Sequence, residues 1–337
     1  MGNINTNIDR ENMNLVNVNI LDKIKKEMNL ALIVPILILI ILWIVIGIKN
    51  PKFITFLSIK RIFIVTIPIM ICAFGVGNII KIGSIDLSIE GQVGFSSVLI
   101  AYLFSHGVNS WIIGVLITLI VAVLIGLING LIYVKLKIPS FLSSLSLGYI
   151  CLGFGNYIYK GQPIIITNKA FRNISLGSIF NLQITIIITI VVFCILFFFE
   201  RRTILGLYIN AIGERETLVK LNGINIGRNK IYSFAIAGFC YGLAGLILTS
   251  RLGSGMSNIG AMLLMNSIAA VIIGGTSMSG GSGSIFGTLI GSFIITTSQT
   301  LVIIFRINPF YQDAIIGLVI ILAILFSTKK GLLVIAK

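Results

Sequence analysis

Charged side chains are scarce in this chain. Only 10% of its 337 residues are Asp, Glu, Lys or Arg, whereas 57% are hydrophobic, and the mean hydropathy is +1.08. Soluble globular domains carry about 25% charged residues. The composition therefore excludes an ordinary soluble domain and predicts one polytopic membrane domain of the all-α class.

Residues that serve metal, redox and nucleotide chemistry are also few. There is one histidine, His106, and the four cysteines (Cys72, Cys151, Cys194 and Cys240) lie in apolar runs without CxxC spacing. No Gly-Lys dipeptide occurs, which excludes a Walker A loop. We expect the thiols to be small buried hydrophobes, and we expect no catalytic residue, metal or cofactor in this chain.

Acidic residues number 10 against 25 basic ones. A basic excess can indicate nucleic-acid binding, but here Lys and Arg flank apolar segments, as do the charges that orient helices in lipid. We therefore expect contact with membrane lipid and none with nucleic acid.

The apolar segments predict ten membrane spans, because about 20 apolar residues cross a bilayer. They are 30–48, 62–81, 87–104, 111–134, 140–158, 184–200, 231–250, 263–278, 285–305 and 312–328. The third and eighth are short or interrupted by glycine. Together they form a transmembrane domain over 30–328, between a poorly ordered tail (1–29) and a short C-terminal tail (329–337).

Basic residues predict the orientation of these spans. Most lie in the segments that are cytosolic if the N-terminus is inside, including the long loop 201–230. Both termini are then cytosolic. An exception is the cluster of Lys49, Lys52, Lys60 and Arg61, which falls on the outer side.

Two similar passages suggest an inverted repeat. Pro139 and Pro309 each precede an apolar span, and each follows a span with a small-xxx-small pair, Gly126/Gly130 and Gly287/Gly291. The two copies have opposite orientations in the ten-span scheme, as in transporters built from inverted repeats.

The stretch Ile268–Gly291 is apolar at both ends and rich in Gly, Ser and Thr in its middle. Irregular backbone at membrane depth needs protein or a water-filled cavity to satisfy its polar groups. Broken helices of this kind are common in transporters, so the run predicts a transport protein.

Acidic residues near membrane depth are Asp86, Glu90 and Asp313. Asp86 and Glu90 are four residues apart and would share one face of a helix, where they could bind a cation, relay protons or bind a polyhydroxy solute. The alternative is that Asp86 or Ser88 caps a helix whose first turn contains Glu90. Asp313 has the same capping alternative.

Uncharged polar residues recur in the apolar spans. Each could bond neighbouring helices, and together they could line a route for a neutral polar solute. The candidate pathway residues are Asp86, Ser88, Glu90, Asn266, Ser267, Thr276, Ser277, Ser298 and Gln299.

The loop 201–230 is long for a simple connection. Ala211–Leu221 can form a short helix that ends at Asn222-Gly223, a favourable C-terminal cap. This helix would either be a solvated connection or expose charged residues to a cytosolic partner, and we favour docking.

Three passages carry a family resemblance: IDLS at Ile85–Ser88, the loop AIGERETLVKLNGINIGRNK with the helix after it, and SIAAVIIGGTSMSGGSGSIFGTLIG. From about residue 60 to 328 the chain resembles the permease subunit of ribose/xylose/galactose-type ABC importers of bacterial plasma membranes.

The resemblance implies a second permease copy, identical or not, two ATPase subunits that bind ATP and Mg²⁺, and an extracytoplasmic solute-binding protein. It also implies that the loop helix docks on the ATPase. The residues that would contact or shape this joint are Glu214, Glu216, Thr217, Lys220 and Gly223.

Two departures from that family pattern concern the solute. Leu264 and Asn266 stand where an acidic pair is usual, and Glu90-Gly91-Gln92 resembles the nucleoside-type permeases of the same superfamily. The favoured function is import of a monosaccharide. Import of a nucleoside is one alternative, and a cation- or proton-coupled secondary transporter that uses Asp86 and Glu90 is another.

Overall fold

Helices make up most of the computed structural model, which describes residues 32–306 and, beyond them, positions 308, 311, 314, 317, 318 and 321. Among the described residues, seven helices are long and apolar enough to cross a membrane. They are the N-terminal helix (Leu32–Lys49), α2 (Phe56–Lys81), α4 (Trp111–Lys135), α5 (Ser140–Tyr159), α7 (Ile184–Arg202), α9 (Ile226–Leu252) and α11 (Ile285–Ile304).

The remaining elements are shorter or less apolar than these helices. Two are apolar helices, α3 (Ile89–Ser105) and α10 (Leu263–Ile273). The others are η1 (Pro51–Ile54), α6 (Lys169–Leu176), α8 (Ile204–Leu221), β1 (Ile164–Ile165), β2 (Ser178–Ile179), β3 (Leu182–Gln183) and β4 (Ser254–Gly255). β1 pairs with β4 and β2 pairs with β3, both antiparallel.

Nine of the ten predicted spans coincide with helices, but the count of ten is not confirmed. The tenth, 312–328, lies almost entirely outside the described residues, as do both tails. The third and eighth are shorter than a span: α3 begins only at Ile89, and α10 stops at Ile273 because Gly274 and Gly275 end it, the latter with φ of 86°. The inverted repeat remains a prediction, since Pro309 is outside the described residues.

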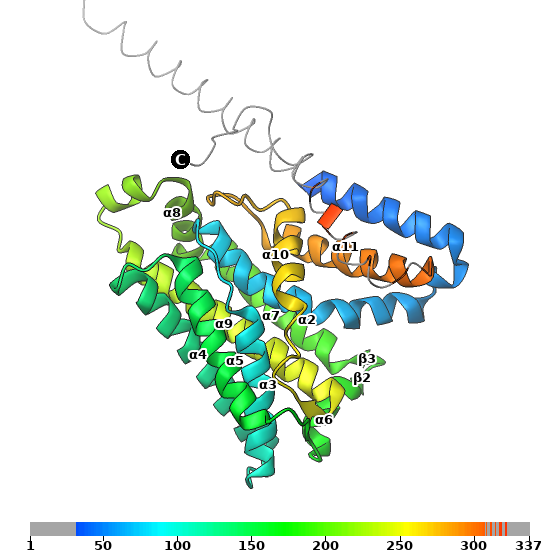
Figure 1. Ribbon diagram of the computed structural model, residues 1–337. Helices are drawn as coiled ribbons and strands as arrows, with labels where there is room; N and C mark the ends of the chain where they lie inside the picture. Colours follow the sequence, from blue (N-terminus) through cyan, green and yellow to red (C-terminus); the bar gives the residue numbers. More distant parts are fainter. Residues whose placement is uncertain are drawn as a thin grey trace, which may run out of the picture.

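The most buried spans are α2, α9 and α11. In their most apolar windows, 78% of α2 and 67% of both α9 and α11 are buried, against 22% of α4 and 11% of the N-terminal helix. Outer helices can expose Ile and Leu because lipid is as apolar as they are. Figure 1 shows the N-terminal helix beside α11 at one edge, where the Trp43 indole donates to the Thr297 hydroxyl at 3.2 Å.

Glycines allow several of these helices to approach closely. A Cβ at Gly126 of α4 would overlap the carbonyl of Phe234 in α9, and one at Gly291 of α11 would overlap the carbonyl of Ala270 in α10. Gly91 of α3 lies equally close to the backbone of Gly148 in α5. The small-xxx-small pairs in the sequence therefore mark helix contacts.

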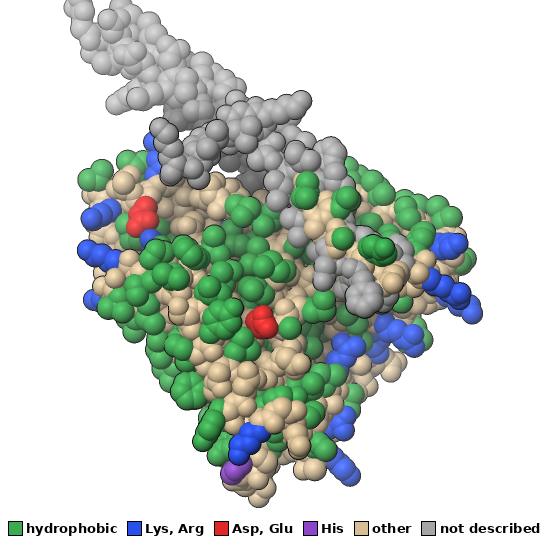
Figure 2. Space-filling view, in the orientation of Figure 1, with side chains coloured by type: hydrophobic (Ala, Val, Ile, Leu, Met, Phe, Trp, Pro, Cys, Tyr) green, Lys and Arg blue, Asp and Glu red, His purple; other side chains and the backbone are tan. Residues whose placement is uncertain are grey.

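Connecting segments gather at two opposite ends of the bundle. The α8 end contains α8, the α2–α3 connection and the Gly/Ser loop 274–284, which are joined by the contacts described below. The hairpin end contains the β2–β3 hairpin, α6 and the β1–β4 pair (Figure 1). Figure 2 shows a broad face of mostly hydrophobic and uncharged side chains between them, with one acidic side chain near its middle and with Lys and Arg along its margins.

Candidate functional site

α8 is a kinked helix at the α8 end. It begins at Ile204, where the Thr203 side chain accepts from the amide of Gly206, and it ends at Leu221, before Gly223 with φ of 73°. Arg215 has φ −152° and ψ 88°, so it breaks the helix within the charged segment. The helix predicted over Ala211–Leu221 exists but starts earlier, because the Thr203 cap allows the apolar run after it to join.

α8 packs directly on the Gly/Ser loop. A Cβ at Gly213 would overlap the carbonyl oxygen of Lys81 and the amide of Gly281, and one at Gly281 would meet the backbone of Glu214 at 2.8 Å. The Gly281 amide donates to the Lys81 carbonyl at 2.9 Å. Gly280 and Gly281 have φ of 86° and 79°, the left-handed region that favours glycine. We call this contact of α8, α2 and the loop the glycine seam.

A buried ion pair lies beside the glycine seam. The Lys81 ammonium is 3.1 Å from the Glu200 carboxylate, with side-chain exposures of 5% and 10%. The same carboxylate oxygen accepts from the amide of Ile285 at 3.0 Å, at the start of α11. Glu200 therefore ties α7 to α2 and α11, and movement of α8 relative to these helices would strain several backbone contacts at once.

The far part of α8 presents exposed side chains. Glu214, Thr217 and Lys220 are exposed, and Leu221 is 83% exposed. Glu216 is exposed as well, but its carboxylate accepts from the Lys230 ammonium at 2.9 and 3.0 Å. Lys230 also donates to the Tyr133 hydroxyl at 3.1 Å, so Glu216 is engaged within the chain.

Asp86 lies in a buried hydrogen-bond chain between α3 and α9. One carboxylate oxygen accepts from the amide and hydroxyl of Ser88 at 2.9 and 2.6 Å, and the other accepts from the Tyr241 hydroxyl at 3.1 Å. Gln92 in turn donates to the Ser88 hydroxyl at 2.8 Å. The Asp86 residue is only 1% exposed.

The predicted shared face of Asp86 and Glu90 is wrong. Asp86 precedes α3, whose N-cap is Ser88, while Glu90 lies in its first turn. The helix cannot start earlier because the 82–88 segment turns at Gly83 (φ 78°) and its amides at Ile85 and Leu87 bond to Ser140 and Ser144 of α5. The arrangement resembles the capping alternative, although Asp86 bonds the Ser88 amide and Ser88 itself makes no side-chain cap.

The other pathway candidates lie on two helices and one loop. Asn266 and Ser267 lie on α10, where the Ser267 hydroxyl donates to the Ile69 carbonyl at 3.3 Å. Ser298 donates within α11 to the Ile294 carbonyl at 2.9 Å. The remaining positions are Thr276 and Ser277 in the Gly/Ser loop and Gln299 on α11. Thus, within one chain, these residues lie on different helix contacts.

Sequence reasoning missed Lys81, Glu200 and Tyr241. Lys81 and Glu200 each end an apolar run, a position at which a charged side chain is usually expected to face solvent. Only the ion pair between them in the folded structure reveals their role. Within the described part of the chain, three or more His, Cys, Asp or Glu side chains never gather as they would around a metal.

A bundle of apolar helices, with short helices inside and a charged kinked helix packed at one end, indicates a multi-pass membrane protein. Comparison with known families agrees. The chain belongs to the family described as branched-chain amino acid transport system / permease component, whose model matches residues 58–324.

Characterised relatives cover most of the chain. The ribose import permease protein RbsC of Bacillus subtilis is 35% identical over 299 residues, which are 88% of this chain and 92% of the relative. RbsC of Haemophilus influenzae is 33% identical, covering 87% and 92%. The galactose/methyl galactoside import permease protein MglC of Escherichia coli is 29% identical, covering 87% and 93%. No solved structure matches the chain.

Proposed function

We propose that this chain is the membrane-spanning permease subunit of an ABC importer for a small polar solute, a monosaccharide of the ribose or galactose kind. The names of its relatives support the solute class, since RbsC and MglC are sugar import permeases. The chain itself performs no covalent chemistry. ATP and Mg²⁺ bind to a separate ATPase subunit.

The observation that carries this proposal is the attachment of α8. Its exposed tip offers charged side chains and the apolar Leu221 to a partner, while its base is held in the glycine seam. A push on the tip is therefore passed to the Lys81 carbonyl and to the loop that leads into α11. Glu214, Thr217 and Lys220 contact the ATPase, Gly223 shapes the end of the helix, and Glu216 supports the joint through Lys230.

The complete importer contains two permease copies, identical or different, two ATPases and an extracytoplasmic solute-binding protein. The α8 end faces the cytosol of a bacterial cell, as do both termini, and the hairpin end faces outward. ATP binding closes the ATPase pair and shifts the population of the permease pair between outward-open and inward-open states.

Nucleoside import is the alternative suggested by Glu90-Gly91-Gln92. The fold supplies its own reason for two of these residues: Gly91 permits the close approach to Gly148, and Gln92 bonds Ser88. The similarity at these two positions therefore has a packing reason and does not by itself indicate a nucleoside.

A cation- or proton-coupled secondary transporter is less consistent with the geometry. Asp86 accepts three hydrogen bonds and does not share a helix face with Glu90. A secondary transporter has no ATPase partner, so it would not need a tightly packed helix such as α8 with an exposed charged end.

Uptake of labelled ribose, galactose and uridine tests the proposal in cells with and without the chain. We expect sugar uptake that is lost with the chain, requires ATP and persists when the proton gradient is dissipated. Uptake of uridine alone would favour the nucleoside alternative. Uptake that follows the proton gradient while ATP is constant would contradict an ABC importer.

A further inference from the structure

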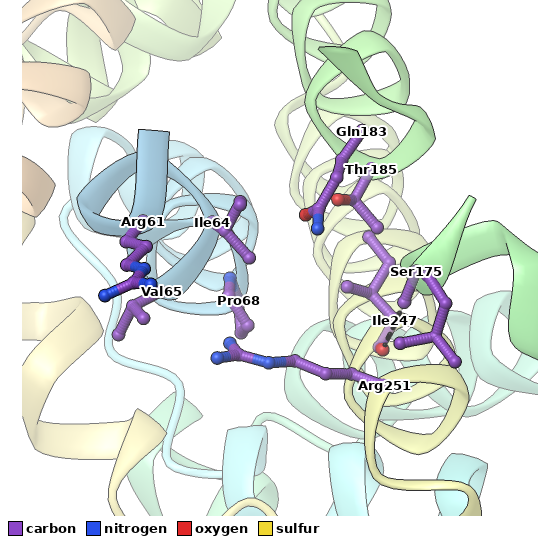
Figure 3. A pocket seen from close by; sticks show the side chains of 10 residues that line it. Arg61, Ile64, Val65, Pro68, Ser175, Gln183, Thr185, Ile247 and Arg251 are labelled. Atoms are coloured by element: carbon purple, nitrogen blue, oxygen red, sulfur yellow. Dashed lines mark hydrogen bonds between the residues drawn. The ribbon is translucent and has the colours of Figure 1, made fainter. Parts of the chain in front are cut away.

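A cavity of about 340 Å³ opens at the hairpin end, between α2, α6, α7 and α9 (Figure 3). Its polar lining comes from Arg61, Arg251, Gln183, Thr185 and Ser175, and its apolar lining includes Pro68 and Ile247. This end lies opposite α8, so the cavity is separate from the proposed ATPase joint.

The charge in this cavity is unbalanced. Arg61 and Arg251 both line it, and its lining contains no acidic residue. Among the residues that the structure describes, ion pairs form only between Lys81 and Glu200 and between Lys230 and Glu216. Two arginines that line one cavity without an acidic residue give it a positive potential, so the cavity favours an anion.

One unsatisfied donor points to the same conclusion. The Thr185 hydroxyl is buried without a hydrogen-bond partner in a residue that is 2% exposed. The unpaired atom of Gln183 is its side-chain amide oxygen, which accepts hydrogen bonds and does not itself attract an anion. Figure 3 shows Gln183 and Thr185 pointing from the start of α7 towards α2, and Arg251 extending across towards Pro68.

The start of α7 adds a favourable field. Its N-cap Gln183 makes no side-chain capping bond, and the first turn of a helix attracts negative charge. The Thr185 hydroxyl and the Arg251 guanidinium thus line one space, with the exposed Arg61 side chain on its α2 side, and a phosphate group could accept from all three.

The surroundings indicate that the anion carries an apolar chain. Val65 and Leu176 line the cavity and are 42% and 55% exposed, and the tip of the neighbouring β2–β3 hairpin exposes 96% of Phe180. The Lys60 ammonium donates to the carbonyl of Asn181 in that hairpin at 2.6 Å. Exposed aromatic and basic residues side by side are typical of headgroup depth.

We propose that this cavity binds one anionic phospholipid. Its phosphate lies between Arg61 and Arg251 and accepts from the Thr185 hydroxyl, and an acyl chain lies over Val65 and Leu176. This site goes beyond solute import, and it gives a purpose to Arg61, which the positive-inside rule leaves unexplained.

Lipid retention tests this site directly. The full chain and the variants Arg251→Gln, Thr185→Val and Lys52→Gln are purified from the same membrane and reconstituted in nanodiscs of phosphatidylcholine with one quarter phosphatidylglycerol. Native mass spectrometry counts the bound phosphatidylglycerol. Lys52 is an exposed basic residue of η1 outside the cavity lining, so Lys52→Gln makes the same charge change as a control.

We expect Arg251→Gln to lose about one phosphatidylglycerol per chain and to weaken binding about ten-fold, because a hydrogen bond to a charged group contributes about that factor. Thr185→Val, which keeps the side-chain shape, should weaken binding less, and Lys52→Gln should leave it unchanged. Each variant must elute from size-exclusion chromatography as the wild type does. If Arg251→Gln does not fold, the weaker lipid binding expected of Thr185→Val is the result that tests the proposal.

Three outcomes would overturn the proposal. Equal retention in all variants would mean that the cavity holds no lipid. Equal loss in Lys52→Gln would mean that retention reflects net charge alone. Displacement of the bound species by inorganic phosphate at equal concentration, with no preference for phosphatidylglycerol, would assign the cavity to a free phosphate instead.

Discussion

Burial separates two ion pairs that look alike in the sequence. Glu200 is 10% exposed at its side chain and also accepts from the Ile285 amide, whereas Glu216 is 52% exposed. Removing one partner of a buried pair leaves an uncompensated charge, while a solvated pair contributes little. The two glutamates therefore have different consequences when neutralised.

Glu200→Gln should lower the free energy of unfolding by about 3–5 kcal/mol, because Lys81 then keeps a buried charge without its partner. Glu216→Gln, the matched control, should cost less than about 1 kcal/mol. Thermal unfolding of the detergent-purified variants measures both. Equal losses would contradict the assignment of Glu200 as the buried anchor.

Asp86 also acts through its hydrogen bonds. Asp86→Asn keeps an oxygen that can accept from Ser88, so uptake should stay close to the wild-type rate, whereas Asp86→Ala should lose about 1–3 kcal/mol of stability because Ser88 and Tyr241 are left without their acceptor. Uptake assays combined with thermal unfolding distinguish the two. If Asp86→Asn folds normally but stops uptake, the carboxylate carries a transport role after all.

At the scale of elements, helix contacts depend on glycines that have no room for a side chain. The glycine seam joins α8, α2 and the Gly/Ser loop through Gly213, Gly280 and Gly281. Elsewhere a glycine can be free of such contacts: a Cβ at Gly153 of α5 would meet nothing within 4 Å. The two kinds of glycine give opposite expectations for the same substitution.

Gly213→Ala should cost about 1–3 kcal/mol, the usual effect of overpacking, and should also reduce transport by displacing α8. Gly153→Ala should be neutral or stabilise the protein by roughly 0.5–1 kcal/mol, because glycine is unfavourable in a helix interior. Thermal unfolding of both variants provides the comparison. A stable Gly213→Ala with normal uptake would show that the seam is looser than the structure indicates.

Much of the arrangement of helices was predictable from the sequence. Span positions followed from apolar runs, and close helix contacts followed from Gly126/Gly130 and Gly287/Gly291. The Asp86–Glu90 face could not be predicted, because the start of α3 is set by bonds from Ser140 and Ser144, far away in the chain. The same limit hid the Lys81–Glu200 pair, whose partners are brought together only by packing of α2 on α7.

For the whole molecule, the separation of α8 from the β2–β3 hairpin predicts sidedness. In a background without cysteines, Thr217→Cys on α8 and Ser178→Cys on the hairpin are both exposed positions. An impermeant maleimide should label Ser178→Cys in intact cells and Thr217→Cys only after permeabilisation. The reverse pattern would invert the proposed orientation and remove α8 from the cytosolic ATPases.

The central claim is that an ATPase drives this permease through α8, and affinity purification in mild detergent from the native membrane tests it most directly. We predict a P-loop ATPase at stoichiometric level with the wild type and with Ile165→Asp, a control at the hairpin end that is 76% exposed, and its loss with Leu221→Asp. A chain that comes out without an ATPase, or a Leu221→Asp variant that retains it fully, would contradict this account.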